Sequence, residues 1–252
     1  MPAVLEKLPL VWTKEEIQKT YLFGVKLTDD NGQPYPDEMY ENWITSAQRT
    51  VERELDIRLT PQTFVAEKHA FVPQNFQKFG WINVYETPIL EVQAVRLMFP
   101  GSSTIYDFPK NWITYDRGGS SRIQIVPSSN ATIPQLLAGA GFNLLTFGGT
   151  IIPDLIEVDY RAGLAEVPYD IRHLIGMLAA IDILNIAGDM LGGAGVASRS
   201  ISLGGMSSSV STTSSPSFSG YGARVIQYDK QIKAMYPRLK TYYGRGVRLS
   251  VA

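Results

Sequence analysis

Hydrophobic and polar positions follow helical spacing at both ends of this chain and alternate in its middle. From residue 37 to residue 58, apolar side chains recur every three or four residues, which predicts one long amphipathic helix. Its apolar face carries Tyr40, Trp43, Ile44, Ala47, Val51 and Leu55. Its opposite face carries Glu41, Gln48, Arg49, Glu52 and Glu54. A short helix is predicted to begin near Thr13, because Thr13 and Glu16 have the spacing of a capping box.

Between residues 61 and 161, prolines, aromatic residues and β-branched residues dominate, and apolar residues do not recur with a helical period. This pattern predicts strands. The predicted strands are 63–71, 80–85, 90–99, 112–116, 122–126 and 155–161. The glycines within residues 117–120 predict a hairpin. For residues 128–150 the sequence is compatible with either a short helix or an apolar loop. Six short strands predict a small antiparallel sheet or sandwich placed between helical parts.

Two further helices are predicted after the strands. Pro168 suits the first turn of a helix, where its missing N–H costs nothing. The apolar residues that follow share one face and are Ile171, Leu174, Ile175, Leu178, Ile181 and Leu184. A last helix, 223–239, has a packing seam of Val225, Tyr228, Ile232, Met235 and Leu239. Residues 246–252 alternate like a strand.

A Ser/Thr-rich run occupies residues 198–219, between the last two helices. Such a run cannot bury enough apolar surface to fold alone, so it is either a flexible linker or a segment that orders against another subunit. The second alternative is motivated by the apolar residues spaced through it. These candidate subunit-interface residues are Ile201, Leu203, Met206, Val210 and Phe218.

Composition narrows the possible classes of protein. The chain has 252 residues and a net charge of −1. Because it contains no cysteine, it forms no disulfide, and this fits folding in a reducing cytosol. Residues 1–60 carry 7 basic and 11 acidic side chains, whereas residues 222–252 carry 7 basic side chains against Asp229 alone. The basic end is either a nucleic-acid patch or a tail that neutralises the acidic part of a neighbour or partner.

Asp182, Asn185 and Asp189 interrupt the apolar run of the helix after Pro168, so no membrane span is expected.

Residues that carry chemistry are sparse. The two histidines, His69 and His173, are far apart and lack the spacing of a metal site. No nucleophile elbow or complete phosphate-binding loop is present. The expectation is therefore a protein without catalytic residues, metal or cofactor.

The order of the motifs resembles the head–tail connector proteins (adaptor or head-completion proteins) of tailed bacteriophages. The resemblance rests on two N-terminal helices with Trp-Ile-x-x-Ala, a β insertion with Tyr-Glu-Thr-Pro-Ile-Leu-Glu-Val, the strand Val-Asp-Tyr-Arg-Ala-Gly, a Pro-Tyr-Asp helix and a final helix with a basic tail. It implies an α+β fold, with a helical connector core of about four helices and an inserted small antiparallel sheet or sandwich. The expected boundaries are 1–60, 61–161 and 162–252, with the first and last parts packing as one core.

The same resemblance implies a structural virion protein, made in the host cytoplasm, that forms a ring of usually twelve subunits below the portal. Its partners would be the portal, further copies of itself and the next neck or tail protein, with double-stranded DNA passing through without sequence-specific binding. The C-terminal tail would dock onto the portal by adding a strand to its sheet. The expected docking residues are Arg238, Lys240, Arg245, Val247, Arg248, Leu249 and Val251. Alternatives are another neck or tail-completion component, or an unrecognised hydrolase or binding domain.

Overall fold

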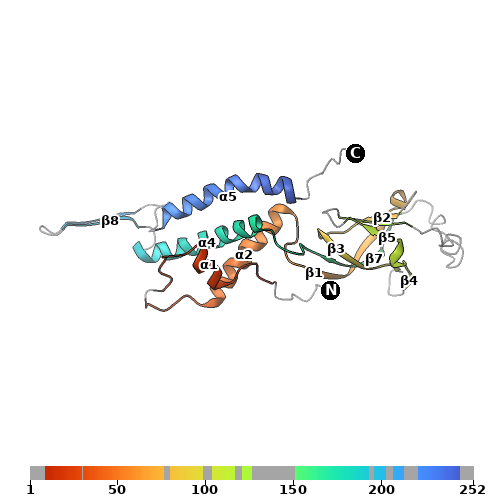
Figure 1. The fold of residues 1–252 in the computed structure, drawn as a ribbon, viewed down its shortest axis with the longest axis horizontal. Helices are drawn as coiled ribbons and strands as arrows, with labels where there is room; N and C mark the ends of the chain where they lie inside the picture. Colours follow the sequence, from red (N-terminus) through yellow and green to blue (C-terminus); the bar gives the residue numbers. More distant parts are fainter. Residues whose placement is uncertain are drawn as a thin grey trace. The chain divides into compact units, whose positions relative to one another are not determined.

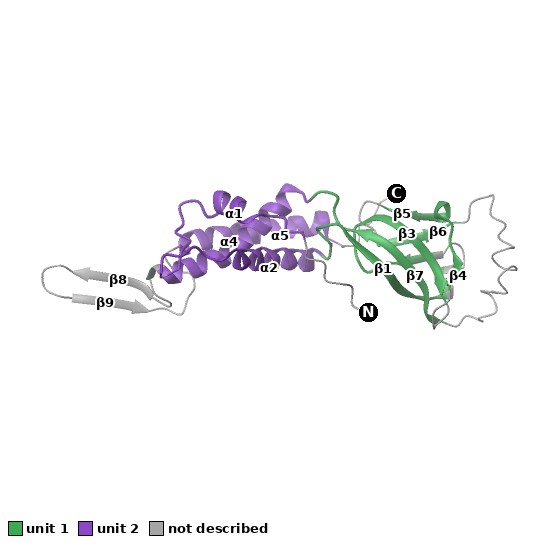
Figure 2. Cartoon of the chain, turned by 90° about the horizontal axis from the view of Figure 1, so that it is seen from below, with its two compact units in different colours: residues 1–5, 56–166 green, residues 6–55, 167–252 purple. Residues whose placement is uncertain are grey.

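Two compact units make up the chain in a computed structural model that describes residues 9–29, 31–76, 80–98, 104–116, 121–126, 151–192, 196–202, 207–212 and 221–244. Residues 6–55 and 167–252 form one unit, here called the helical unit, and residues 1–5 and 56–166 form the other, here called the β unit (Figure 2). The chain thus builds two helices, leaves for the β unit, and returns to complete the helical unit. The α+β class expected from the sequence is confirmed.

The described residues of the helical unit form four helices: α1 (Lys14–Thr20), α2 (Asp37–Leu55), α4 (Tyr169–Gly192) and α5 (Gly222–Tyr243) (Figure 1). Both α2 and α5 pack against α4. Two strands, β8 (Val196–Ser202) and β9 (Ser207–Thr212), form an antiparallel hairpin between α4 and α5. Each predicted helix is present, and α5 runs four residues beyond its predicted end.

The start of α1 is the predicted capping box. The Thr13 side chain accepts a hydrogen bond from the backbone N–H of Glu16, and the Glu16 carboxylate accepts one from the backbone N–H of Thr13. Two backbone donors that a helix start leaves unpaired are therefore satisfied within four residues. This short helix needs that local support, because seven residues are too few to be stable alone.

The central helix, α4, is buried on more sides than the predicted single face. Met177, Ala180 and Ile183 are fully buried although they lie outside the predicted stripe, whereas Leu178 and Ile181 within it are only half-buried. A helix that is apolar around most of its circumference belongs in the middle of a bundle. Its position between α2 and α5 is therefore set by composition rather than by amphipathic spacing.

Two residues assigned to the polar face of α2 are buried, which corrects that assignment. Gln48 and Glu52 are 1% and 5% exposed. The Gln48 side chain accepts from the backbone N–H of Val11 and donates to the carbonyl of Pro9, and Glu52 pairs with Arg49 at 3.2 Å. The segment before α1 thus covers this face of α2, and Gln48 supplies hydrogen bonds that an apolar residue could not.

Two antiparallel sheets form the β unit. One has the order β1-β7-β3-β4 and the other β2-β6-β5. Their strands are β1 (Gln62–Phe71), β2 (Gly80–Asn83), β3 (Ile89–Met98), β4 (Thr104–Asp107), β5 (Ile113–Tyr115), β6 (Arg122–Ile125) and β7 (Ile152–Ala162). The six predicted strands are all present, β5 pairs with β6 as the hairpin prediction requires, and β4 was not predicted. Residues 128–150 and 246–252, for which alternatives or a strand were predicted, lie outside the described residues.

One apolar core lies between the two sheets, so the β unit is a small sandwich. It includes Val95 and Ile156 from the larger sheet and Ile123 from the smaller one, all fully buried. The central strand β7 pairs with β1 along one edge and with β3 along the other. Strand β7 therefore holds the larger sheet together.

The two ends of the β unit meet where β1 begins and β7 finishes. Gln62 pairs with Ala162 across the two strands, and the next residue, Gly163, donates its backbone N–H to the carbonyl of Pro88. Gly163 has a φ of +132°, and a Cβ at this position would lie 2.5 Å from the carbonyl oxygen of Thr60. Only glycine fits both the backbone conformation and the space.

We predict that Gly163→Ala destabilises the protein by at least about 2 kcal/mol, because strain and overlap with the Thr60 backbone add together. Chemical denaturation measures this loss. The matched control is Gly24→Ala, whose φ of +78° is also positive but which has open space around it, so it should cost about 1 kcal/mol. Equal losses in the two variants would contradict the role given to close packing at Gly163.

Candidate functional site

Tyr21, directly after α1, joins three helices of the helical unit. Its hydroxyl lies 2.7 Å from Nδ1 of His173 on α4, and the hydroxyl of Tyr228 on α5 donates to the Tyr21 carbonyl at 3.0 Å. Burial raises the pKa of Tyr21 above its ordinary value of 10.0, so the phenol stays protonated at neutral pH. Gly176 on α4 provides the space for this ring, because a Cβ there would lie 2.3 Å from it. Tyr21 therefore contacts both α4 and α5 from the end of α1.

Trp12 and Arg172 form a second link between α1 and α4. The Trp12 indole N–H donates to the carbonyl of Arg172 at 2.6 Å, and the Arg172 guanidinium lies over the indole ring at 4.2 Å. The same guanidinium is 2.8 Å from the carboxylate of Glu16. The backbone N–H of Thr13, and next Arg172, hold the pKa of Glu16 below its ordinary value. The capping-box glutamate thus also anchors its helix to α4.

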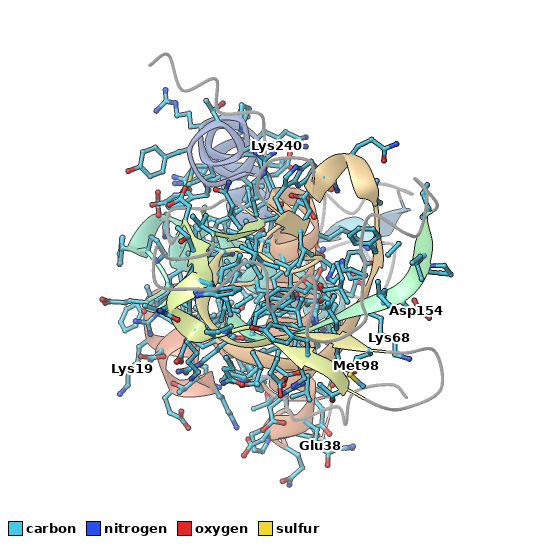
Figure 3. The ribbon with its side chains drawn as sticks, turned by 90° about the vertical axis from the view of Figure 1, so that its right-hand side faces the viewer. Lys19, Glu38, Lys68, Met98, Asp154 and Lys240 are labelled. Atoms are coloured by element: carbon cyan, nitrogen blue, oxygen red, sulfur yellow. The ribbon has the colours of Figure 1, made fainter. Side chains whose placement is uncertain are left out.

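The predicted portal-docking residues are only partly within the described structure. Arg238 and Lys240 lie on α5, and both are exposed; Figure 3 labels Lys240. Arg245, Val247, Arg248, Leu249 and Val251, with the predicted C-terminal strand, lie outside the described residues. The predicted seam of α5 is confirmed, since Ile232 and Leu239 are buried and Val225, Tyr228 and Met235 half-buried. Arg238 and Lys240, the sequence neighbours of Leu239, therefore flank that seam on opposite sides of α5.

The predicted subunit-interface residues fall in and around the β8–β9 hairpin. Ile201 lies in β8, where it pairs with Ser208, and Val210 lies in β9, where it pairs with Arg199. Leu203, Met206 and Phe218 lie outside the described residues. A run that cannot fold alone was expected from residue 198 to residue 219, whereas the structure pairs residues 196–202 with 207–212. Antiparallel pairing satisfies the backbone donors and acceptors that face each other across the two strands.

A buried polar network in the β unit includes His69, to which the sequence assigned no role. Nε2 of His69 donates to Oε1 of Glu67 at 2.8 Å, since a carboxylate only accepts. The same oxygen accepts from the backbone N–H of Tyr85, and Oε2 accepts from the hydroxyl of Tyr160 at 2.5 Å. The Tyr160 hydroxyl in turn accepts from the backbone N–H of Glu86. Both carboxylate oxygens are engaged, so the network fixes β1 to β7 and to the turn at residues 85–86.

Burial and hydrogen bonding act in opposite directions on the ionisation of Glu67. Burial raises its pKa, but the hydrogen bonds from His69, Tyr160 and Tyr85 outweigh burial, and the net pKa lies below the ordinary 4.5. Burial, and the neighbouring Glu67 carboxylate, raise the pKa of Tyr160. Glu67 is therefore ionised and Tyr160 protonated at neutral pH, which is the pairing that the geometry requires.

Arg96 on β3 organises a second charged cluster in the β unit. Its guanidinium is 2.9 Å from Glu157, 2.5 Å from Asp159 and 3.3 Å from Asp107. The other oxygen of Asp159 accepts from the backbone N–H of Ala66, which has a φ of +58° at the irregularity in the β1–β7 pairing. The carboxylate thereby stabilises a bulge in β1 and ties three strands together.

Neither a metal site nor a free-standing membrane span is indicated in the described part of the chain. No group of three or more His, Asp or Glu side chains is placed there to hold a metal ion. Helix α4, from Tyr169 to Met190, has the length and composition of a membrane span, but 61% of its most apolar stretch is buried within the protein. Such burial is what a core helix shows.

Comparisons with known proteins give a similarity to solved structures only at the level of the fold. The sequence matches no protein-family profile and no curated protein. Among solved structures, the chain is similar to one described as the neck of an empty GTA particle computed with C6 symmetry, with a TM-score of 0.42 and 18% sequence identity. The similarity covers 69% of this chain and 76% of that one. These values assign no residue of this chain to a residue of that structure.

We predict that Gly176→Ala weakens the packing of α1 by about 1–3 kcal/mol, because the added methyl overlaps the Tyr21 ring. Thermal unfolding measures the loss. In a Tyr21→Leu background the same substitution should cost clearly less, since the ring that it meets is gone. Additive losses in the double variant would show that the two residues do not meet.

The lowered pKa of Glu67 predicts a defined pH dependence of stability. Because the folded pKa lies below 4.5, the stabilisation is present above that pH and is lost as the pH falls through the folded pKa. Glu67→Gln should therefore reduce stability by about 1–3 kcal/mol at pH 7 and flatten the dependence on pH below 4.5. Urea unfolding between acid and neutral pH measures both effects. The exposed Glu91→Gln is the control, and an equal response in both variants would refute the assignment.

Proposed function

We propose that this chain is a structural protein of a phage neck, where identical copies form a ring of twelve subunits below the portal and join head to tail. The observation that carries the proposal is the insertion of the β unit between α2 and α4. The helical unit is built from the first two helices and the last two, and the sandwich is added at a single point. This is the arrangement that the resemblance to head–tail connector proteins implies.

The order of the resembling motifs supports the proposal further. The Val-Asp-Tyr-Arg-Ala-Gly segment is the end of β7 together with Gly163, the residue that closes the β unit against Thr60. The Pro-Tyr-Asp segment is the first turn of α4. The Trp-Ile-x-x-Ala segment lies in α2, where Ile44 and Ala47 are buried. The motifs thus coincide with the positions that connect the two units and pack the helices.

Two surfaces would make the connections that a neck protein needs. The basic C-terminal part, with Arg238 and Lys240 exposed on α5 and Arg245, Val247, Arg248, Leu249 and Val251 beyond it, would dock onto the portal by strand addition. The hairpin region, with Ile201, Leu203, Met206, Val210 and Phe218, would contact the next subunit. The assembled ring would extend the DNA channel and present a platform for the next neck or tail protein.

Mixing the chain with the portal protein of the same particle tests this function. We predict a complex with several copies of the chain per portal, detected by mass photometry or native mass spectrometry. Deleting residues 244–252 should leave thermal unfolding unchanged and abolish the complex. Raising the salt concentration should weaken the complex formed by the intact chain, because charge pairs at its rim are screened.

The control for the deletion is Lys19→Glu, an exposed charge reversal on α1 that should leave attachment to the portal intact. An intact, folded chain that stays monomeric and unbound in the presence of its portal would contradict the proposed function. Normal attachment of the truncated chain would contradict only the role of the tail.

A further inference from the structure

The second half of α4 presents a stripe of partly exposed residues that has no basic partner. Leu178, Asp182, Asn185 and Asp189 follow at spacings of four, three and four, which places them on one side of the helix. Leu178 and Asn185 are half-buried, and both aspartates are exposed. We call these four residues the α4 stripe.

Polar groups of the α4 stripe lack partners among the described residues. Asn185 Oδ1 is buried without a hydrogen bond, and neither aspartate makes an ion pair there. Asp182 is exposed as a residue, but the part of its carboxyl that packs against the protein raises its pKa, with no opposing interaction from a cation. An exposed carboxylate without a cation partner is a favourable place for an ammonium group from another molecule.

The outer side of α5 carries a stripe with the same spacing and the opposite charge. Ile226, Lys230, Lys233 and Pro237 follow at four, three and four residues, and all four are exposed. Among the described residues, Lys230 makes no hydrogen bond or ion pair, and Lys233 is 74% exposed and pairs with Asp229 on its own helix. We call these residues the α5 stripe. A helix of 22 residues that buries only Gly222, Ile232 and Leu239 leaves this side open to a partner.

We propose that the α5 stripe of one subunit packs along the α4 stripe of the next, so that the occupant of each stripe is a second copy of this chain. Aligning the two stripes in either direction places one lysine beside Asp182 and the other beside Asn185. At the ends of the contact, Leu178 faces one of the two apolar residues Ile226 and Pro237, and Asp189 faces the other. This inference rests on the proposed function and adds the surfaces that form the ring.

The two stripes belong to the same chain but differ from one another, so the contact is head-to-tail. Such a heterologous interface closes into a ring when the rotation between neighbours divides a full turn. Each subunit offers one basic and one acidic surface, and every surface is used once. The chain's net charge of −1 is therefore compatible with an interface built on charge complementarity.

Charge reversal tests the contact. One variant carries Asp182→Lys and Asp189→Lys, and a second carries Lys230→Glu and Lys233→Glu. Each alone should raise the concentration needed for assembly, alone or on the portal, by about tenfold or more, because residue 182 then faces a like charge and the two stripes carry charge of the same sign. Glu38→Lys, exposed at the start of α2, is the matched control and should assemble normally (Figure 3).

Rescue makes the test specific. Mixing the two non-assembling variants should restore a ring in which they alternate, and combining all four substitutions in one chain should restore it as well. Mass photometry measures assembly, and thermal unfolding confirms that each variant is folded. Unimpaired assembly of either variant, or failure of both rescues, would overturn the contact while leaving the proposed function in place. A wild-type chain that assembles neither alone nor on its portal would overturn the proposed function itself.

Discussion

The β unit can be inserted between α2 and α4 only if its two ends lie together, and the close approach of Gly163 to Thr60 allows this. A side chain at residue 163 would overlap the Thr60 carbonyl, and the positive φ there disfavours any residue except glycine. The neighbouring pair of Gln62 and Ala162 starts β1 beside the end of β7. Because β7 pairs on both edges, the whole larger sheet takes its register from this point.

Much of the fold was predictable from the sequence because local signals were strong. The capping box at Thr13 and the alternation along β7 each determine an element without help from distant residues. Strand β4 was missed because four residues between turn-forming segments carry too little pattern. The burial of Gln48 could not be predicted, because its hydrogen-bond partners are backbone groups of residues 9 and 11. The pattern of apolar residues along α2 carries no information about contacts with that segment.

The candidate site was less predictable than the fold, for a related reason. The basic excess near the C-terminus is visible in the sequence, and the structure adds that Lys230 and Lys233 share one exposed side of α5. The α4 stripe could not be predicted from the sequence, because α4 is apolar around most of its circumference. The packing of α2 and α5 against α4 determines which of its residues remain exposed to solvent. In the network of Glu67, His69 and Tyr160, the pairing of β1 with β7 brings Tyr160 to Glu67 across 93 residues of sequence. The spacing of these residues along the sequence does not reveal that contact.

A reconstruction by electron cryo-microscopy of the virion neck in which this chain is proposed to lie tests the central claim most directly. The account predicts a closed ring of identical subunits on the portal, with α5 of each subunit lying along the second half of α4 of its neighbour. A neck that contains no copy of this chain would contradict the account. A ring whose neighbours meet through other surfaces, with both stripes facing solvent, would contradict the charge-complementary contact.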